Sequence, residues 1–229
     1  MVLSDFLNGL QRIFTGDPEI WGIALLSIIV SGTAVSLASL IGIPLGIWMG
    51  RSRRMNGIIP TTVLNTLMGL PPVLIGLVVF LILASEGPLG SLQLIFTPMA
   101  MVIAQFVLTL PIVVGLTKSA IANLPEELPA LLKTLGASQV QLRAEIWKEA
   151  RAGIIIGVIT ALGRAFSEVG AVLIVGGNLK GYTRILTTAI VTETSKGNYG
   201  VSLALGTLLF SISLILTGTV TFLQIRLTK

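Results

Sequence analysis

Arg164 and Glu168 are the only two charged residues well inside an apolar stretch of this sequence. A charge in the hydrocarbon core of a bilayer costs at least about 2.5–3.5 kcal/mol, so neither side chain is expected to face lipid. On a continuous helix their i, i+4 spacing would place them on one face beside Ser167, where they could neutralise each other. Two interpretations remain open. The pair lines or gates a transport path, or it is a buried ion pair that fixes this helix to its neighbours.

Hydroxyl and basic side chains follow in the next part of the sequence. Lys180 and Arg184 supply positive charge, and the hydroxyl donors are Thr187, Thr188, Thr192 and Thr194. Such donors suit a doubly charged tetrahedral oxyanion that is held by several weak contacts and then released. Threonines in membrane helices more often bond their own backbone, which is the competing interpretation. The candidate path or gate comprises Arg164, Ser167, Glu168, Gly170, Asn178, Thr187 and Thr188.

Other kinds of chemistry lack the residues they need. The sequence has no cysteine and no histidine, which removes disulfides, thiol nucleophiles, the usual zinc sites and histidine acid–base catalysis. No nucleophile–base pair or metal cluster is evident, so we assign no catalytic residue and no metal ligand and do not expect an enzyme. The G-x-x-x-x-G-K-[ST] phosphate cradle is also absent. The chain therefore has no evident means of binding ATP and no cofactor of its own.

The composition indicates an all-α integral membrane protein. Hydrophobic residues make up 53% and charged residues 11% of the 229 residues, whereas a soluble domain has about 25% charged residues. A short amphipathic helix in the membrane interface is expected over 2–14, within an N-terminal segment 1–20. The main domain, 21–223, precedes a cytoplasmic tail, 224–229. Five apolar runs are long enough to span a bilayer: 21–49, 58–84, 94–116, 153–175 and 201–223.

Charge asymmetry predicts the orientation of these spans. One set of alternate loops and ends contains ten Lys and Arg residues and the other contains four. The positive-inside rule then places the N-terminus outside and the C-terminus in the cytoplasm. The basic residues therefore set orientation, and the net charge of +5 does not indicate nucleic-acid binding.

Prolines interrupt the predicted spans. Pro71 and Pro72 lie in the middle of the second span, while Pro98 and Pro111 lie near the ends of the third. Each proline removes a backbone donor and bends or breaks a helix, which membranes tolerate where the backbone is buried in protein or lines a cavity. The pattern favours a moving, water-accessible core, although any single proline could serve packing alone.

The loop 118–152 is the most polar part of the chain and is predicted to be cytoplasmic. Residues 128–134 and 140–151 have helical composition. Gly136 can supply the left-handed conformation that ends the first helix, and Ser138 can cap the second. The composition alone also fits a solvated helical hairpin with no partner.

This loop resembles the coupling loop of permease subunits from binding-protein-dependent ABC importers. Their signature reads Glu-Ala-Ala, three residues, Gly, nine residues, Ile, one residue, Leu-Pro. Gly136 and Ile146 match its Gly and Ile with the nine-residue gap, but Ala130 stands at the Glu position and Lys148-Glu149 replaces Leu-Pro. The resemblance implies a type I permease fold and an ATPase-coupling segment, comprising Leu135, Gly136, Ala137, Ser138, Gln139 and Ile146.

A second resemblance covers 162–200. The run GRAFSEVGAVLIVGGN and the following TRILTTAI are similar to the molybdate, tungstate and sulfate permeases, and most similar to the tungstate branch. It implies import of tungstate or a close oxyanion across a prokaryotic inner membrane, from an extracytoplasmic binding protein. It also implies a homodimer with two copies of a cytoplasmic ATPase, which binds the ATP and Mg²⁺. Molybdate or sulfate import is the first alternative. A self-contained secondary transporter is less consistent with one intramembrane acid and no detectable repeat.

Overall fold

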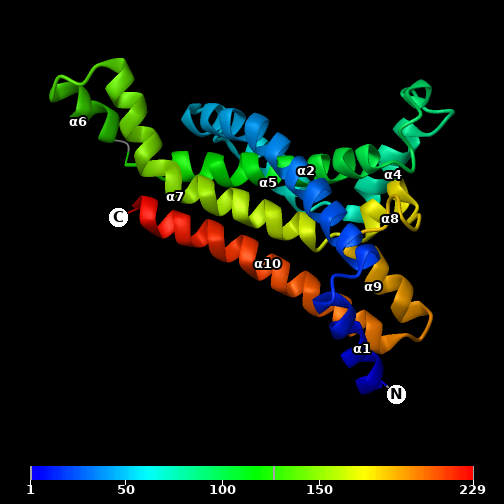
Figure 1. The fold of residues 1–229 in the computed structure, drawn as a ribbon. Helices are drawn as coiled ribbons and strands as arrows, with labels where there is room; N and C mark the ends of the chain where they lie inside the picture. Colours follow the sequence, from blue (N-terminus) through cyan, green and yellow to red (C-terminus); the bar gives the residue numbers. More distant parts are fainter. Residues whose placement is uncertain (1, 126, 229) are drawn as a thin grey trace.

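The computed structural model describes residues 2–125 and 127–228, and these ranges contain helices and no strand. The prediction of an all-α fold is confirmed. The helices are α1 (Val2–Phe14), α2 (Pro18–Arg51), α3 (Ile58–Met68), α4 (Pro72–Leu83), the 3₁₀ turn η1 (Gly90–Leu92), α5 (Pro98–Ala122), α6 (Leu128–Thr134), α7 (Gln139–Phe166), α8 (Gly170–Gly176), α9 (Leu186–Ser195) and α10 (Tyr199–Thr228). In Figure 1, α6 lies at one end of the molecule and α1 and α9 lie at the other, with α2, α5, α7 and α10 running between them.

Helices α2 and α5 pack closely because glycines line their contact. Gly46 lies against Thr117, and a Cβ added to this glycine would stand 2.6 Å from the Cβ of Thr117. Gly42 and Gly50 repeat the arrangement one turn away on either side, against Val113 and the region of Ile121. Small residues at i, i+4 spacing let membrane helices approach until their backbones nearly touch. This contact forms the centre of the fold.

Two of the predicted spans are broken rather than continuous. The span expected over 58–84 consists of α3 and α4, which meet at 87°, and α7 meets α8 at 58°. Pro72 lacks an N–H group and disfavours a helical conformation at Pro71, so α3 ends at Met68 and α4 starts afresh. Three helices are long and apolar enough to cross a membrane in the described ranges, or up to five if each bent pair is one span.

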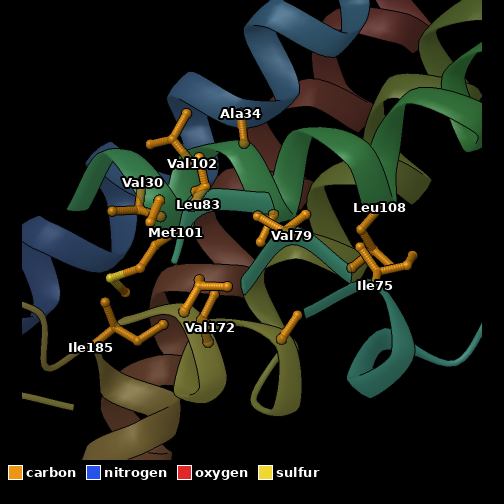
Figure 2. Packing of buried hydrophobic residues seen from close by; sticks show 14 residues of the cluster. Val30, Ala34, Ile75, Val79, Leu83, Met101, Val102, Leu108, Val172 and Ile185 are labelled. Atoms are coloured by element: carbon orange, nitrogen blue, oxygen red, sulfur yellow. The ribbon is translucent and has the colours of Figure 1, made fainter. Parts of the chain in front are cut away.

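The second halves of the two broken spans pack together in the largest apolar cluster. Figure 2 shows Ile75, Val79 and Leu83 of α4 in one cluster with Val172 of α8, where Ile75 lies beside Leu108 of α5 and side chains of α2 also take part. A Cβ on Gly76 would lie 2.6 Å from the Cα of Ala171. The second halves of the two broken spans, α4 and α8, are thereby held against each other.

Near the two ends of the chain, α1 has the predicted bounds, whereas α2 and α10 are longer than the predicted spans 21–49 and 201–223. Helix α1 spans 2–14 as expected, and it packs on α10, where a Cβ on Gly9 would lie 2.6 Å from the Cβ of Ala204. Helix α2 begins at Pro18, capped by Asp17, whose Oδ1 accepts hydrogen bonds from the amides of Glu19 and Ile20 at 2.9 and 3.4 Å. Helix α10 continues to Thr228, so most of the predicted tail 224–229 is helical.

Candidate functional site

A helical hairpin forms at the end of the molecule opposite α1. Helix α6 ends in a turn at Gly136, whose φ of +81° lies in the left-handed region that glycine tolerates. Ser138 then begins α7 with a capping box. Its Oγ accepts from the Gln141 amide at 3.3 Å, and the Gln141 side chain accepts from the Ser138 amide at 2.8 Å. Both predicted helices and both predicted caps are confirmed.

The predicted coupling residues divide into two groups. Leu135 is 74% exposed at the tip, and Ser138 and Gln139 are exposed beside it, while Ala137 is half-buried. Ile146 is only 7% exposed and packs in a cluster with Ile121 at the end of α5. Ile146 therefore anchors the hairpin to the rest of the chain, and the exposed tip is free to meet another protein.

The hairpin is continuous with the membrane segment. The expected boundary between a loop helix and a span starting at residue 153 does not exist, because α7 runs from Gln139 to Phe166 without interruption. Displacement at the tip would therefore be transmitted along one helix. That helix ends at the second break in the membrane region.

Three buried side chains satisfy the backbone at the break between α7 and α8. Gln105 of α5 donates from Nε2 to the Ala165 carbonyl at 3.1 Å, and Thr187 of α9 donates to the Glu168 carbonyl at 2.9 Å. The Glu168 carboxylate accepts from the Ala171 amide at 2.9 Å, near the start of α8. Gln105, Glu168 and Thr187 are 0%, 5% and 6% exposed. An interrupted helix needs such partners, since water is not available inside a bilayer.

The predicted pairing of Arg164 with Glu168 is not observed and needs correction. Their i, i+4 geometry required a continuous helix, but α7 ends at Phe166 between them. Arg164 is half-buried and forms no ion pair within the described ranges, whereas Glu168 is engaged at the start of α8. Ser167 is exposed and donates to the Arg164 carbonyl at 3.1 Å. Gly170 lies against Val73, so it permits close packing of the two broken spans.

The predicted anion-binding threonines donate mainly to backbone carbonyls. Thr188 is 1% exposed and donates to the Ile185 carbonyl at 3.0 Å, and Thr187 donates to Glu168 as described above. Asn178 donates to the Thr192 hydroxyl at 2.7 Å and accepts from Arg184 Nε at 3.3 Å. These contacts support the competing interpretation, in which the hydroxyls stabilise the folds around α8 and α9.

A cavity of about 480 Å³ lies between α2, α9 and the start of α10. Four cations line it: Lys180 pairs with Glu19 at 3.0 Å, Lys196 with Glu193 at 2.7 Å and Arg12 with Asp17 at 2.8 Å, while Arg184 donates to the Asn178 side-chain oxygen. Hydrogen bonds from Lys196 and then Asn198 lower the pKa of Glu193, so this carboxylate stays charged at neutral pH. Three of the four cations are therefore paired with carboxylates, and within the described ranges Arg184 forms no ion pair.

Comparison with known proteins identifies the family to which the chain belongs. Residues 42–229 match the model of a family described as the binding-protein-dependent transport system inner membrane component. The chain belongs to this family. It is a permease, a membrane-embedded transport subunit rather than an enzyme.

Two relatives are similar over most of the permease. A tungstate uptake system permease protein from Peptoclostridium acidaminophilum is 42% identical over 97% of this chain and 98% of its own length. A probable anion ABC transporter permease protein from Haloferax volcanii is 40% identical over 84% of this chain and 85% of its own length. The fold is similar to that in a structure of the MetNI methionine ABC transporter in inward-facing conformations. The TM-score is 0.56, over 92% of this chain and 93% of that chain, at 16% identity.

An exposed stripe of small and polar residues lies at the C-terminal end of α7 in the permease. Thr160 and Gly163 of α7 and its C-cap Ser167 follow helical spacing and are all exposed, and the two hydroxyls donate to the carbonyls of Ile156 and Arg164. Arg164 borders this stripe and is half-buried. Polar and charged groups at membrane depth usually face a bundle interior or a water-filled cavity. Two of the residues predicted to line the path lie at this end of α7: Ser167 in the stripe and Arg164 at its edge.

Two polar residues were missed by the sequence analysis. Gln105 is a lone amide in an apolar run, and that isolation was the available signal. Lys118 was assigned to the cytoplasmic loop because the third span was expected to end at residue 116. Helix α5 instead continues to Ala122, and Lys118 is 6% exposed with its ammonium 2.7 Å from the Thr61 hydroxyl.

Replacing Thr187 with valine tests the polar contacts at the α7–α8 break. The substitution removes the hydrogen bond to the Glu168 carbonyl while keeping the shape of the side chain. Losing a partner for a buried polar group costs about 1–3 kcal/mol, so the apparent melting temperature of the purified permease should fall by roughly 2–10 °C. Thr207→Val is the matched control, because Thr207 is exposed and bonds only its own helix at Leu203. Equal shifts for the two variants would contradict a specific role of Thr187.

Proposed function

We propose that this permease imports tungstate, or a closely related oxyanion, in an ATP-driven transporter. It receives the anion from an extracytoplasmic binding protein and releases it to the cytoplasm by alternating access. The observation that carries the proposal is the near full-length similarity to the tungstate permease of Peptoclostridium acidaminophilum. The similarity to a probable anion permease supports the same class of cargo.

A separate ATPase supplies the energy in this proposal. The sequence has no phosphate-binding loop of its own, and the hairpin at Leu135–Gln139 presents exposed residues on a helix that leads to the α7–α8 break. Two copies of a cytoplasmic ATPase bind ATP and Mg²⁺ and move the hairpins as they close. The N-terminus is then outside and the hairpin is cytoplasmic, as the charge asymmetry predicts.

The permease works as a homodimer in the proposed transporter. Arg164, at the edge of the exposed stripe of Thr160, Gly163 and Ser167, is poorly suited to lipid. A two-fold axis beside α7 would bring two such stripes around one path. Two arginines at membrane depth would offset the charge of a divalent oxyanion, while Glu168 is turned to the α8 backbone. Gly170, Asn178, Thr187 and Thr188 hold the surrounding elements in place.

Reconstitution tests this function directly. The permease is reconstituted in proteoliposomes with the ATPase and the binding protein of the same transport system. Tungsten uptake is then measured by mass spectrometry. We expect uptake that requires ATP and the binding protein and that vanadate inhibits. Unlabelled molybdate and sulfate are added as competitors. Uptake without ATP would indicate a secondary transporter, and transport of sulfate but not tungstate would contradict the proposed cargo.

A further inference from the structure

Helix α3 has three distinct faces in the structure. With 3.6 residues per turn, its residues separate into a buried face and two exposed faces. The buried face carries Leu64, which is 7% exposed, and the half-buried Met68. One exposed face, the apolar sector, comprises Ile59, Val63 and Leu67. The other, the polar sector, comprises Thr62, Asn65 and Thr66 and is continued by the C-cap Gly69; the first residue of the helix, Ile58, is 86% exposed on the same side.

The two exposed sectors require different surroundings. Ile59, Val63 and Leu67 are 78%, 54% and 42% exposed, and their side chains suit contact with lipid. Asn65 is also exposed, but an amide facing lipid would have no partner for its hydrogen bonds. Helix α3 has 11 residues and ends at the bend before α4, so it extends about 16 Å, roughly half of a hydrocarbon core. The polar sector therefore lies at membrane depth on a side that is not suited to lipid.

A buried cation lies at the beginning of this sector. Lys118 of α5 donates to the hydroxyl of Thr61, one turn before Asn65. The lysine is 6% exposed and has no carboxylate within ion-pair distance in the described ranges. A buried ammonium without a counter-charge is costly. An anion that passes along the adjacent polar sector would supply the missing counter-charge to the Lys118 ammonium.

We infer that the polar sector of α3 and Lys118 form an oxyanion-binding stretch in the half of the transport path nearest the coupling hairpin. The amide of Asn65 and the hydroxyl of Thr62 would replace part of the anion's hydration, and the ammonium would supply charge. The Thr66 hydroxyl donates to the Thr62 carbonyl and marks the same side of the helix. The inference rests on the proposed oxyanion transport. It adds α3, the first half of the broken span α3–α4, as a second lining of the path beside the α7 stripe.

Cysteine accessibility tests the location of the water-filled side. The chain has no native cysteine, so Thr62→Cys, Asn65→Cys and Thr66→Cys each give a single reporter. The assembled transporter in lipid nanodiscs is treated with a membrane-impermeant, negatively charged methanethiosulfonate, and modification of this chain is followed by mass spectrometry. Only a thiolate reacts, so the polar-sector positions should react at least about tenfold faster than lipid-facing ones.

Positions on the apolar sector of the same helix are the matched controls. Val63→Cys and Leu67→Cys are each one residue, about 1.5 Å along the helix axis, from Thr62 and Thr66, so they differ mainly in the direction they face. Equal rates in the two sectors, or protection of the polar sector by a second copy detected as a disulfide between copies, would overturn the inference. Wild-type uptake of tungstate is measured in parallel, so a failure of the proposed function is distinguished from a failure of this assignment.

The role of Lys118 is tested separately by comparing how fast a negatively charged and a positively charged reagent modify the same cysteine. At Asn65→Cys, with each rate divided by the rate of the same reagent with a free thiol, the anionic reagent should be favoured over a trimethylammonium reagent of similar size. Adding Lys118→Gln should abolish this preference, whereas Lys118→Arg should keep it. A preference unchanged by Lys118→Gln would exclude the lysine from the stretch. If Lys118→Gln prevents assembly, two measurements still decide whether the polar sector is positive. One is the preference for the anionic reagent when Lys118 is unchanged, and the other is whether Lys118→Arg keeps that preference.

Discussion

Replacing Gly46 with valine is expected to prevent the permease from reaching its folded structure. A Cβ at this position would lie 2.6 Å from the Cβ of Thr117 and 2.8 Å from the Val114 carbonyl oxygen. A backbone atom cannot yield as a flexible side chain does, so α2 and α5 would have to separate. Overpacking usually costs about 1–3 kcal/mol and more where the backbone must move, so a loss of at least about 3 kcal/mol is expected.

The measurement is the yield of monodisperse permease after detergent extraction, together with its melting temperature. Gly22→Val is the matched control, because the same substitution on the same helix meets no atom within 4 Å of the added Cβ. Gly22→Val should leave both quantities nearly unchanged. If Gly46→Val is extracted in equal yield with an unchanged melting temperature, the close contact of α2 and α5 does not determine stability.

The sequence predicted local structure correctly where that structure depends on residues close together in the chain. The hairpin of α6 and α7 illustrates this, since Gly136 and Ser138 act through their own backbone conformation and the amide of Gln141. The Pro71–Pro72 break could also be located, because two successive prolines disrupt a helix. Its angle of 87° could not, since it depends on how α4 packs against α8. The expectation of an interruption was wrong for the third span, since Pro98 begins α5 and Pro111 lies inside it without ending it.

The break between α7 and α8 had no comparable local signal. Its sequence, Phe166-Ser-Glu-Val-Gly170, contains no proline, and Arg164 and Glu168 were therefore expected on one helical face. The partners that support the break are distant in sequence, since Gln105 bonds the carbonyl of Ala165 across 60 positions. Thr187 reaches the Glu168 carbonyl from α9. Contacts of this kind follow from tertiary packing, and one sequence does not reveal them.

Replacing Leu135 with aspartate is expected to detach the permease from its ATPase. Leu135 and Val140 are 74% and 76% exposed on either side of the turn, so the tip of a polar hairpin carries two apolar side chains that the permease does not bury. Apolar groups of this kind act as docking anchors when a partner covers them. A buried anchor in an interface contributes about 2–4 kcal/mol, which corresponds to a loss of affinity of roughly 30-fold to 1,000-fold.

The dissociation constant of the ATPase for the permease in nanodiscs measures this effect. Leu179→Asp makes the same substitution at an exposed leucine at the opposite end of the molecule, and it should leave the dissociation constant unchanged. Leu135→Asp should also abolish stimulation of ATP hydrolysis by the binding protein, because α7 carries any movement of the tip to the α7–α8 break as one continuous helix. Unchanged affinity for Leu135→Asp would place the docking surface elsewhere. Lost affinity with intact stimulation would show that energy reaches the path by a route other than α7.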